Sequence, residues 1–131
     1  MIEPIRMRSS IKPESFVDLG SGNWYYNYDI NSESTNTLIS SSNDDSGDPT
    51  IYNFIQIKVS GKPDYKKYTE LIIREHITQS QEFDLINSYN RALLGTISED
   101  EVKKALVNYT DYLNKIAEIK SKIKKDFEQQ T

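Results

Sequence analysis

The hydrophobic period of this sequence changes at Gly61, and that change constrains the fold more than any other feature. Before Gly61, residues 23–30 and 51–60 alternate between two kinds of side chain, with many aromatic and β-branched residues. Such alternation is typical of strands with one buried face. After Gly61, apolar residues recur at helical spacing. The sequence therefore predicts an α+β fold, in which an antiparallel β-hairpin packs on about three helices.

The two predicted strands match each other as a hairpin. Pairing Ile30 with Ile51 sets Tyr26 opposite Ile55 and brings the richer apolar faces onto one side of the sheet. The residues expected on that buried face are Trp24, Tyr26, Tyr28, Ile30, Ile51, Ile55, Ile57 and Val59. We therefore predict that the aromatic residues of "GNWYYNYDI" mainly form core.

The opposite face of the hairpin carries Tyr25, Tyr52 and Phe54 among polar side chains. This face is too aromatic for ordinary solvent-exposed surface and too polar for a second core. Aromatic side chains bury a large area with few rotatable bonds, which suits them to protein interfaces. We therefore expect these three residues to contact a protein partner.

Helix boundaries are marked by local signals. Pro63 precedes the first helical stripe, and Thr78 or Ser80 is placed to cap a second helix. Gly95 stands where a left-handed residue ends a helix, and Ser98 with Glu101 forms a capping box. The predicted helices are residues 64–77, 80–94 and 99–128.

The last predicted helix is long for a single domain of 131 residues. Residues 99–128 would extend ~45 Å, whereas a compact domain of this length is roughly 35 Å across. We therefore expect its distal apolar stripe to be covered by an irregular N-terminal arm, residues 1–21, or by another chain. The stripe consists of Ile116, Ile119, Ile123 and Phe127.

The remaining segments favour ordinary structural roles. We expect residues 31–50 to form a polar loop, and Asp44, Asp45 and Asp48 within it lack the spacing of an EF-hand. The segment "GSG" at 20–22 precedes a strand, so it does not fit a phosphate-binding loop. His76 is the only histidine, and we expect it to cap a helix or to lie on the surface.

Composition excludes several classes of function. The chain has no cysteine, which removes disulfides and thiolate catalysis. Its net charge of −4 argues against a general nucleic-acid binder, and no apolar run reaches the length of a signal peptide or a membrane span. The lysines of "KIAEIKSKIKKDF" are expected to line the wet side of the last helix. We therefore expect no enzyme, cofactor, metal, small-molecule substrate, nucleic acid or membrane.

A resemblance follows from four segments: "GNWYYNYDI", "GKPDYKKYTELIIREHI", "QEFDLINSYN" and "YTDYLNKIAEIKSKIKKDF". Together they resemble small proteins of unassigned function that phages and prophages of Bacteroides-type bacteria encode near structural and tail genes. The last helix is also similar to the ends of phage tail-fibre assembly chaperones. The resemblance implies no active-site residue.

Two hypotheses of function follow. The first is a non-enzymatic structural or interaction protein of the phage particle, a tail, connector or capsid-accessory component made in the host bacterial cytoplasm. The second is a tail-fibre assembly chaperone that the virion does not retain. Both act through protein–protein contacts, with other phage structural proteins or with further copies of the chain.

Overall fold

The computed structural model describes residues 1–34 and 50–129, so most of the predicted polar loop, with Asp44, Asp45 and Asp48, lies outside the described residues. Where the sequence predicts one domain, the described chain divides into two compact units. A sheet unit comprises Pro4–Asp64, and a helical unit comprises Met1–Glu3 with the residues from Tyr65 onward. The predicted α+β class is confirmed, as is the long last helix.

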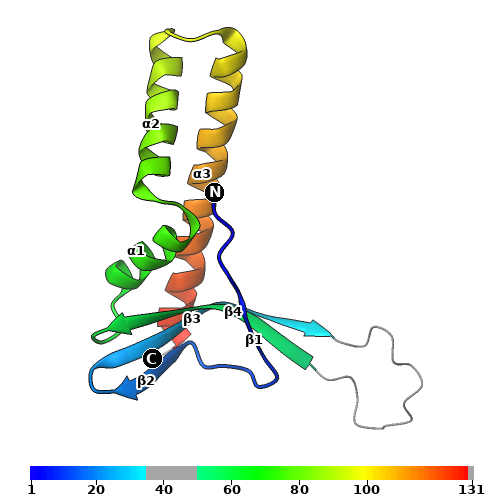
Figure 1. Cartoon of the computed structure of the whole chain (residues 1–131), viewed down its shortest axis with the longest axis vertical. Coiled ribbons are helices and arrows are strands. Elements are labelled where there is room, and N and C mark those ends of the chain that lie inside the picture. The colour runs from blue at the N-terminus through cyan, green and yellow to red at the C-terminus, as the bar shows by residue number, and fades with distance from the viewer. Residues whose placement is uncertain (35–49, 130–131) are drawn as a thin grey trace, which may run out of the picture. The chain divides into compact units, whose positions relative to one another are not determined.

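The sheet unit contains four antiparallel strands (Figure 1). They are β1 (Met7–Ser9), β2 (Phe16–Gly20), β3 (Asn23–Ser34) and β4 (Thr50–Ser60). The predicted hairpin is β3 with β4, and β1 and β2 pair along its two sides in the order β1-β4-β3-β2. The prediction of an irregular N-terminal arm is therefore wrong, because this segment supplies the two edge strands that a lone hairpin lacks.

The β3–β4 pairing is antiparallel as predicted, but its register differs. Tyr26 pairs with Ile57 rather than Ile55, so the strands are shifted by two residues and the same faces still coincide. A bulge adds one residue to β3 between Tyr28 and Asn31, and Asp29 within it has a positive φ of 56°. The predicted pairing of Ile30 with Ile51 fails, because the shift of two residues before the bulge becomes three after it and sets Ile51 opposite Glu33.

Arg6 stabilises the bulge. Its guanidinium forms an ion pair of 3.1 Å with the Asp29 carboxylate and donates to the Asp29 carbonyl oxygen. It also donates to Oδ1 of Asn53 at 2.6 Å, on the neighbouring strand. Both the charge and the backbone of the strained residue are thus satisfied by a segment 23 residues earlier in the chain.

The turn between β2 and β3 explains the "GSG" segment. Ser21 and Gly22 connect the paired residues Gly20 and Asn23, and both have positive φ angles, 49° and 83°. Two consecutive positive φ angles are the geometry of a two-residue hairpin turn, which favours glycine. This segment is therefore a hairpin turn.

The aromatic cluster of β3 is mostly core, as predicted. Tyr26 and Tyr28 are buried, and the ring of Tyr26 stacks on that of Phe16 with centroids 4.9 Å apart. Trp24 is only half-buried, so the prediction holds for it in part. The next residue on the opposite face, Tyr25, is also half-buried.

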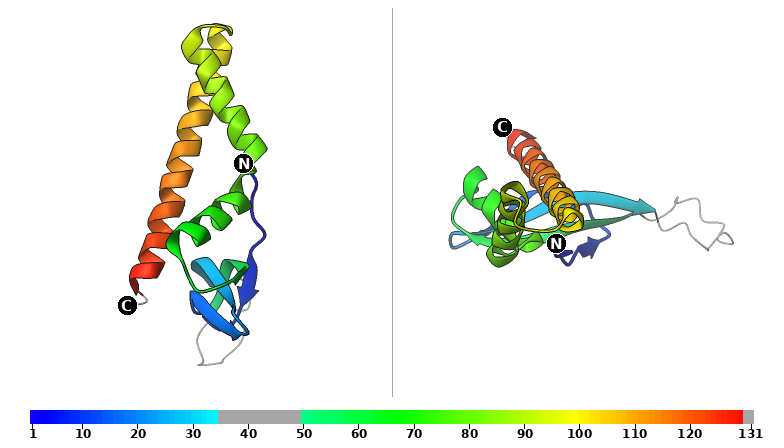
Figure 2. Two further views of the ribbon diagram at one scale, coloured as in Figure 1. Left: turned by 90° about the vertical axis from the view of Figure 1, so that its left-hand side faces the viewer. Right: turned by 90° about the horizontal axis from the view of Figure 1, so that it is seen from above.

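The helical unit contains α1 (Tyr65–His76), α2 (Gln79–Leu94) and α3 (Glu99–Gln129). The predicted boundaries agree to within one residue. Thr78 caps α2 in a reciprocal capping box with Gln81, and Gly95 ends α2 with a φ of 69°. The Ser98 hydroxyl accepts a hydrogen bond from the backbone of Glu101 at the start of α3. Figure 2 shows α2 and α3 as antiparallel neighbours.

We predict that replacing Tyr26 by Ala destabilises the protein by ~3–5 kcal/mol, the usual cost of truncating a buried aromatic residue. Tyr26 is 0% exposed. Tyr25→Ala is the matched control, since it removes the same side chain from the adjacent, half-buried position. Urea denaturation measures both free energies of unfolding, and equal losses would contradict the assignment of Tyr26 to the core.

Candidate functional site: the α2–α3 hairpin

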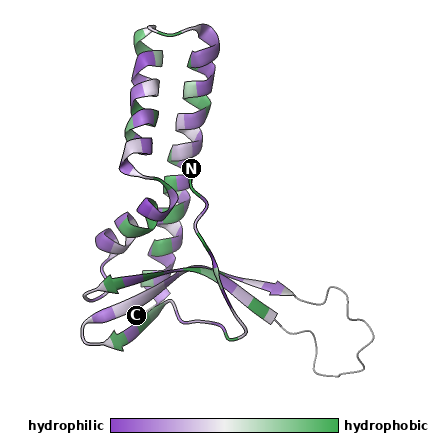
Figure 3. Ribbon diagram, viewed as in Figure 1, coloured by the Kyte–Doolittle hydropathy of each residue, from purple (hydrophilic) through white to green (hydrophobic). Residues whose placement is uncertain are grey.

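The helical hairpin, α2 with residues 99–113 of α3, leaves large apolar side chains in water. Among the described residues of α2 none is buried, and in this part of α3 the buried residue is Ala105. Phe83 and Leu93 on α2 are 63% and 65% exposed, and Leu106 and Leu113 on α3 are 41% and 50% exposed. Figure 3 shows apolar positions recurring along both helices. The hairpin is therefore the candidate interaction surface of the helical unit.

The exposed apolar side chains lie on two stripes of residues, one along each helix, and the two stripes adjoin each other. On α2, Ile86, Asn90 and Leu93 recur at spacings of four and three residues, and on α3 Leu106, Tyr109 and Leu113 do the same at three and four. Tyr89 of α2 stacks on Tyr109 of α3 with centroids 4.4 Å apart, which joins the two helices. We name the surface "the hairpin face": Phe83, Ile86, Asn90, Leu93, Leu106, Tyr109 and Leu113.

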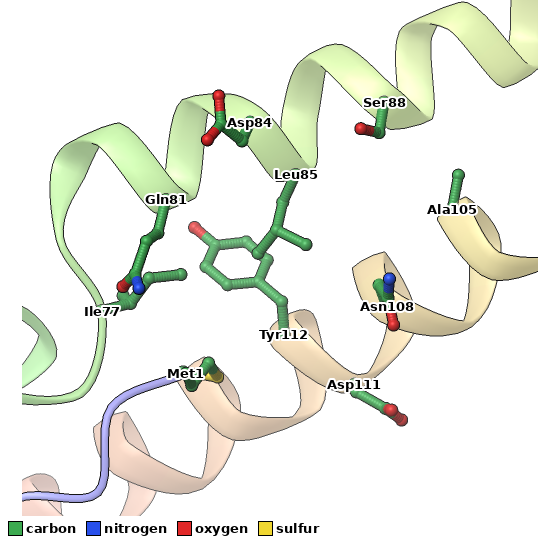
Figure 4. Close-up of a pocket in the computed structure, with 10 residues that line it drawn as sticks. All are labelled: Met1, Ile77, Gln81, Asp84, Leu85, Ser88, Ala105, Asn108, Asp111 and Tyr112. Atoms are coloured by element: carbon green, nitrogen blue, oxygen red, sulfur yellow. The ribbon is translucent and has the colours of Figure 1, made fainter. Parts of the chain in front are cut away.

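A groove of about 570 Å³ opens on the other side of the hairpin. Leu85 of α2 lines it together with Ala105 and Tyr112 of α3 (Figure 4). A helix turns by 100° per residue, so Ile86 and Leu106 lie on the flank of their helices that faces away from this groove. The groove and the hairpin face are therefore opposite sides of one helical pair.

The groove does not assemble an acid–base pair. In Figure 4 the carboxylates of Asp84 and Asp111 point away from each other, and the ring of Tyr112 lies next to Leu85. Gln81, Ser88 and Asn108 add neutral polar groups to its lining. General acid–base work needs two titratable groups converging on one position, and these two carboxylates do not converge.

One carboxylate links all three helices. The Glu82 side chain on α2 forms an ion pair of 3.0 Å with Arg74 on α1 and accepts a hydrogen bond from the Tyr112 hydroxyl on α3. The Tyr112 hydroxyl and the Arg74 guanidinium hold the pKa of Glu82 below its usual value, against the opposing effect of desolvation. Burial, with the adjacent Glu82 carboxylate, raises the pKa of Tyr112 to about 12. Glu82 is therefore charged at neutral pH.

The predicted stripe of α3 is covered within the helical unit. Ile119 and Ile123 are buried, and the ring of Phe127 meets Tyr65 and Tyr68 of α1 edge-on at centroid distances of 6.0 and 5.9 Å. The expectation that the N-terminal arm or another chain must cover this stripe is wrong, because α1 packs along the second half of α3. Ile116 is half-buried.

The predicted partner-binding face of the sheet is only partly exposed. Phe54 is buried, whereas Tyr25 and Tyr52 are half-buried. Met7 of β1 pairs with Phe54, so the edge strand that the sequence prediction omitted lies beside this residue. The structure does not bring these three residues together with the stripe of α3 as one site, since they belong to different units.

His76 is buried, so the surface alternative of the prediction is wrong. Its Nδ1 lies 2.9 Å from the carbonyl oxygen of Ile72, one turn earlier in α1. Its own carbonyl oxygen accepts a hydrogen bond of 2.7 Å from the backbone N–H of Ile2. The N-terminal residues thus satisfy a carbonyl at the end of α1 that the helix leaves unpaired.

Residues 1–34 and 50–129 contain no group of three or more His, Cys, Asp or Glu side chains placed to hold a metal ion. None of the helices in the described part of the chain is long and apolar enough to cross a membrane. Comparison with models of known protein families, with curated proteins and with solved structures finds no match to this chain. The candidate site therefore rests on the geometry of the helical unit.

We predict that Glu82→Gln lowers the pKa of Tyr112 from about 12. A phenol whose pKa is higher in the folded protein stabilises the fold below its unfolded pKa of about 10, and this stabilisation is lost as the pH rises through the folded pKa. Ultraviolet absorbance of tyrosinate follows the titration, and Tyr112→Phe identifies the step that belongs to Tyr112. Glu70→Gln is the control, because Glu70 pairs with the same Arg74 at 2.8 Å. An unchanged titration in Glu82→Gln would contradict the proposed linkage.

Proposed function

We propose that this chain is a non-enzymatic structural or interaction protein of a bacteriophage particle, a tail, connector or capsid-accessory component. It acts through protein–protein contacts made by the hairpin face. The observation that carries the proposal is the exposure of large apolar side chains on both helices of the hairpin, among them Phe83, Leu93 and Leu113. Contiguous apolar surface of this kind usually marks a protein interface.

The energetics support a contact surface. Fully burying a side chain such as Leu or Phe contributes about 1.5–3 kcal/mol relative to leaving it exposed. Phe83, Leu93, Leu106 and Leu113 remain 41% to 65% exposed in this chain, so much of that contribution is still available to a partner. A helix pair that presents such side chains in register provides the flat apolar surface on which a second protein packs.

Tyr25 and Tyr52 of the sheet unit remain a second proposed contact surface. Both are half-buried, so each leaves part of its ring for a partner. Phe54 is buried at 5% exposure, and we do not propose it as a contact residue. Ile119 and Ile123 are fully buried and belong to the core of the helical unit, so the hairpin face replaces the stripe of α3 as the main proposed surface.

The phage setting of this proposal comes from the sequence resemblance. The presence of the chain in phage particles can be measured directly. We predict that mass spectrometry of gradient-purified particles finds the chain. Leu113→Glu should remove it from the particles, because a charge enters the hairpin face. Asn114→Glu is the matched control, since it places the same charge on the neighbouring exposed residue and should be retained.

Far-UV circular dichroism of both variants checks that the helices are intact. A chain that is abundant in infected cells but absent from finished particles would favour the assembly chaperone over the structural component. A chain that associates with no phage protein in either setting would overturn the proposal.

A further inference from the structure

We infer that the partner of the hairpin face is a second copy of this chain, and that two hairpins associate about a two-fold axis as a four-helix bundle. The inference rests on the proposed function, since it names the occupant of the same surface. In such a two-fold interface, both copies contribute the same surface, the hairpin face.

The hairpin lacks a second layer of helices that would bury its apolar side chains. Helices are stable in a domain when an apolar stripe is buried against another element. Among the described residues of α2 none is buried, and residues 99–113 of α3 bury only Ala105. The Tyr89–Tyr109 stack therefore joins two helices that lack a core of their own. A second helix pair laid on the hairpin face supplies one, as in antiparallel four-helix bundles.

The hairpin face is large enough for a specific interface. α2 has 16 residues and is ~24 Å long, and two adjacent helices are roughly 20 Å wide. The flat footprint is thus about 480 Å² per copy, and the accessible surface of interdigitating side chains is larger. A specific interface buries at least about 1,000 Å² in total. Two hairpin faces packed against each other bury a total area in that range without any other contact.

The hairpin face contains no charged residue. A surface that meets its own copy must not place like charges opposite each other. The hairpin face has one polar residue, the neutral Asn90, and its other members are Phe, Ile, Leu and Tyr. The charged residues Asp84 and Arg91 lie on other flanks of α2, as the helical spacing requires. Depletion of charge at the centre is the feature that distinguishes interfaces from ordinary surface.

Asn90 gives this surface a specificity element. An isolated Asn in the apolar seam of a helical bundle fixes register, because its amide is satisfied only when it meets a polar group of the other helices. Asn90 lies between Ile86 and Leu93 in the stripe of α2. In a two-fold bundle, the same amide approaches from both copies, and the pair can satisfy each other.

Sedimentation equilibrium of the full chain tests the inference. The wild type should sediment at twice the chain mass of 15.2 kDa. Leu106→Glu should weaken the dimer on the order of 100-fold or more, since each interface carries the substitution twice. Val107→Glu is the matched control: Val107 is the adjacent apolar residue, is 58% exposed, and lies off the hairpin face. It should leave the dimer unchanged.

A second measurement does not depend on a destabilising charge. The chain has no cysteine, so Asn90→Cys introduces a single thiol. Mild oxidation of this small side chain should link the two copies of the dimer through a disulfide, and Arg91→Cys should give much less of the linked species. A wild type that stays monomeric at high micromolar concentration overturns the inference, as does equal dissociation by Leu106→Glu and Val107→Glu.

The outcomes separate the two proposals. A monomeric chain that still enters phage particles, and loses this ability in Leu113→Glu, overturns the self-association and leaves the proposed function standing. A dimer that is absent from particles and binds no phage protein confirms the self-association and overturns the proposed function.

Discussion

The interaction on which the helical unit depends is the ion pair and hydrogen bond that meet at Glu82. Arg74 donates to this carboxylate from α1, and Tyr112 donates to it from α3. Arg74 also donates to the carbonyl oxygen of Ile77 at 3.1 Å, which closes the backbone at the break between α1 and α2. Three helix directions are thus fixed by one partly buried carboxylate. Removing it would leave the Tyr112 hydroxyl without this acceptor, whereas Arg74 would keep Glu70 and the carbonyl oxygen of Ile77.

This junction divides α3 into two parts with different surroundings. The helix has 31 residues and is ~46 Å long. α1 packs on its second half, where Ile119 and Ile123 are buried. α2 packs on its first half, where apolar side chains stay in water. The same amphipathic pattern therefore makes a core at one end of the helix and an exposed apolar surface at the other.

Local features were predictable from the sequence, and features set by distant residues were not. The limits of α1, α2 and α3 follow from caps such as Thr78 and Gly95, whose effect reaches only a few residues. The β3–β4 register differs from the prediction by two residues before the bulge at Asp29 and by three after it, and the bulge is held by Arg6, 23 residues away. β1 is only three residues long and β2 five, too short for a clear alternation, so the edge strands were missed.

The predicted contact stripe of α3 proves buried for a related reason. Periodicity identified the apolar stripe of α3 correctly but does not say which part of it another helix covers. The sequence analysis leaves the distal stripe to the N-terminal arm or to another chain, although α1 is equally able to cover it. The second alternative makes Ile119 and Ile123 contact residues, whereas both are buried. The available signal was on α2, where Phe83, Leu93 and Leu94 exceed what one neighbouring helix can bury.

The hydrogen bond from Ile2 to the carbonyl of His76 has a consequence for the order of folding. It makes the helical unit discontinuous in sequence, with its first three residues separated from the rest by the whole sheet unit. During synthesis those residues leave the ribosome before their acceptor, which is made only after all four strands. Closing so long a loop is slow compared with forming a helix. The docking of residues 1–3 on α1 is therefore a late event, so substitutions at Ile2 should affect the last step of folding rather than its nucleus.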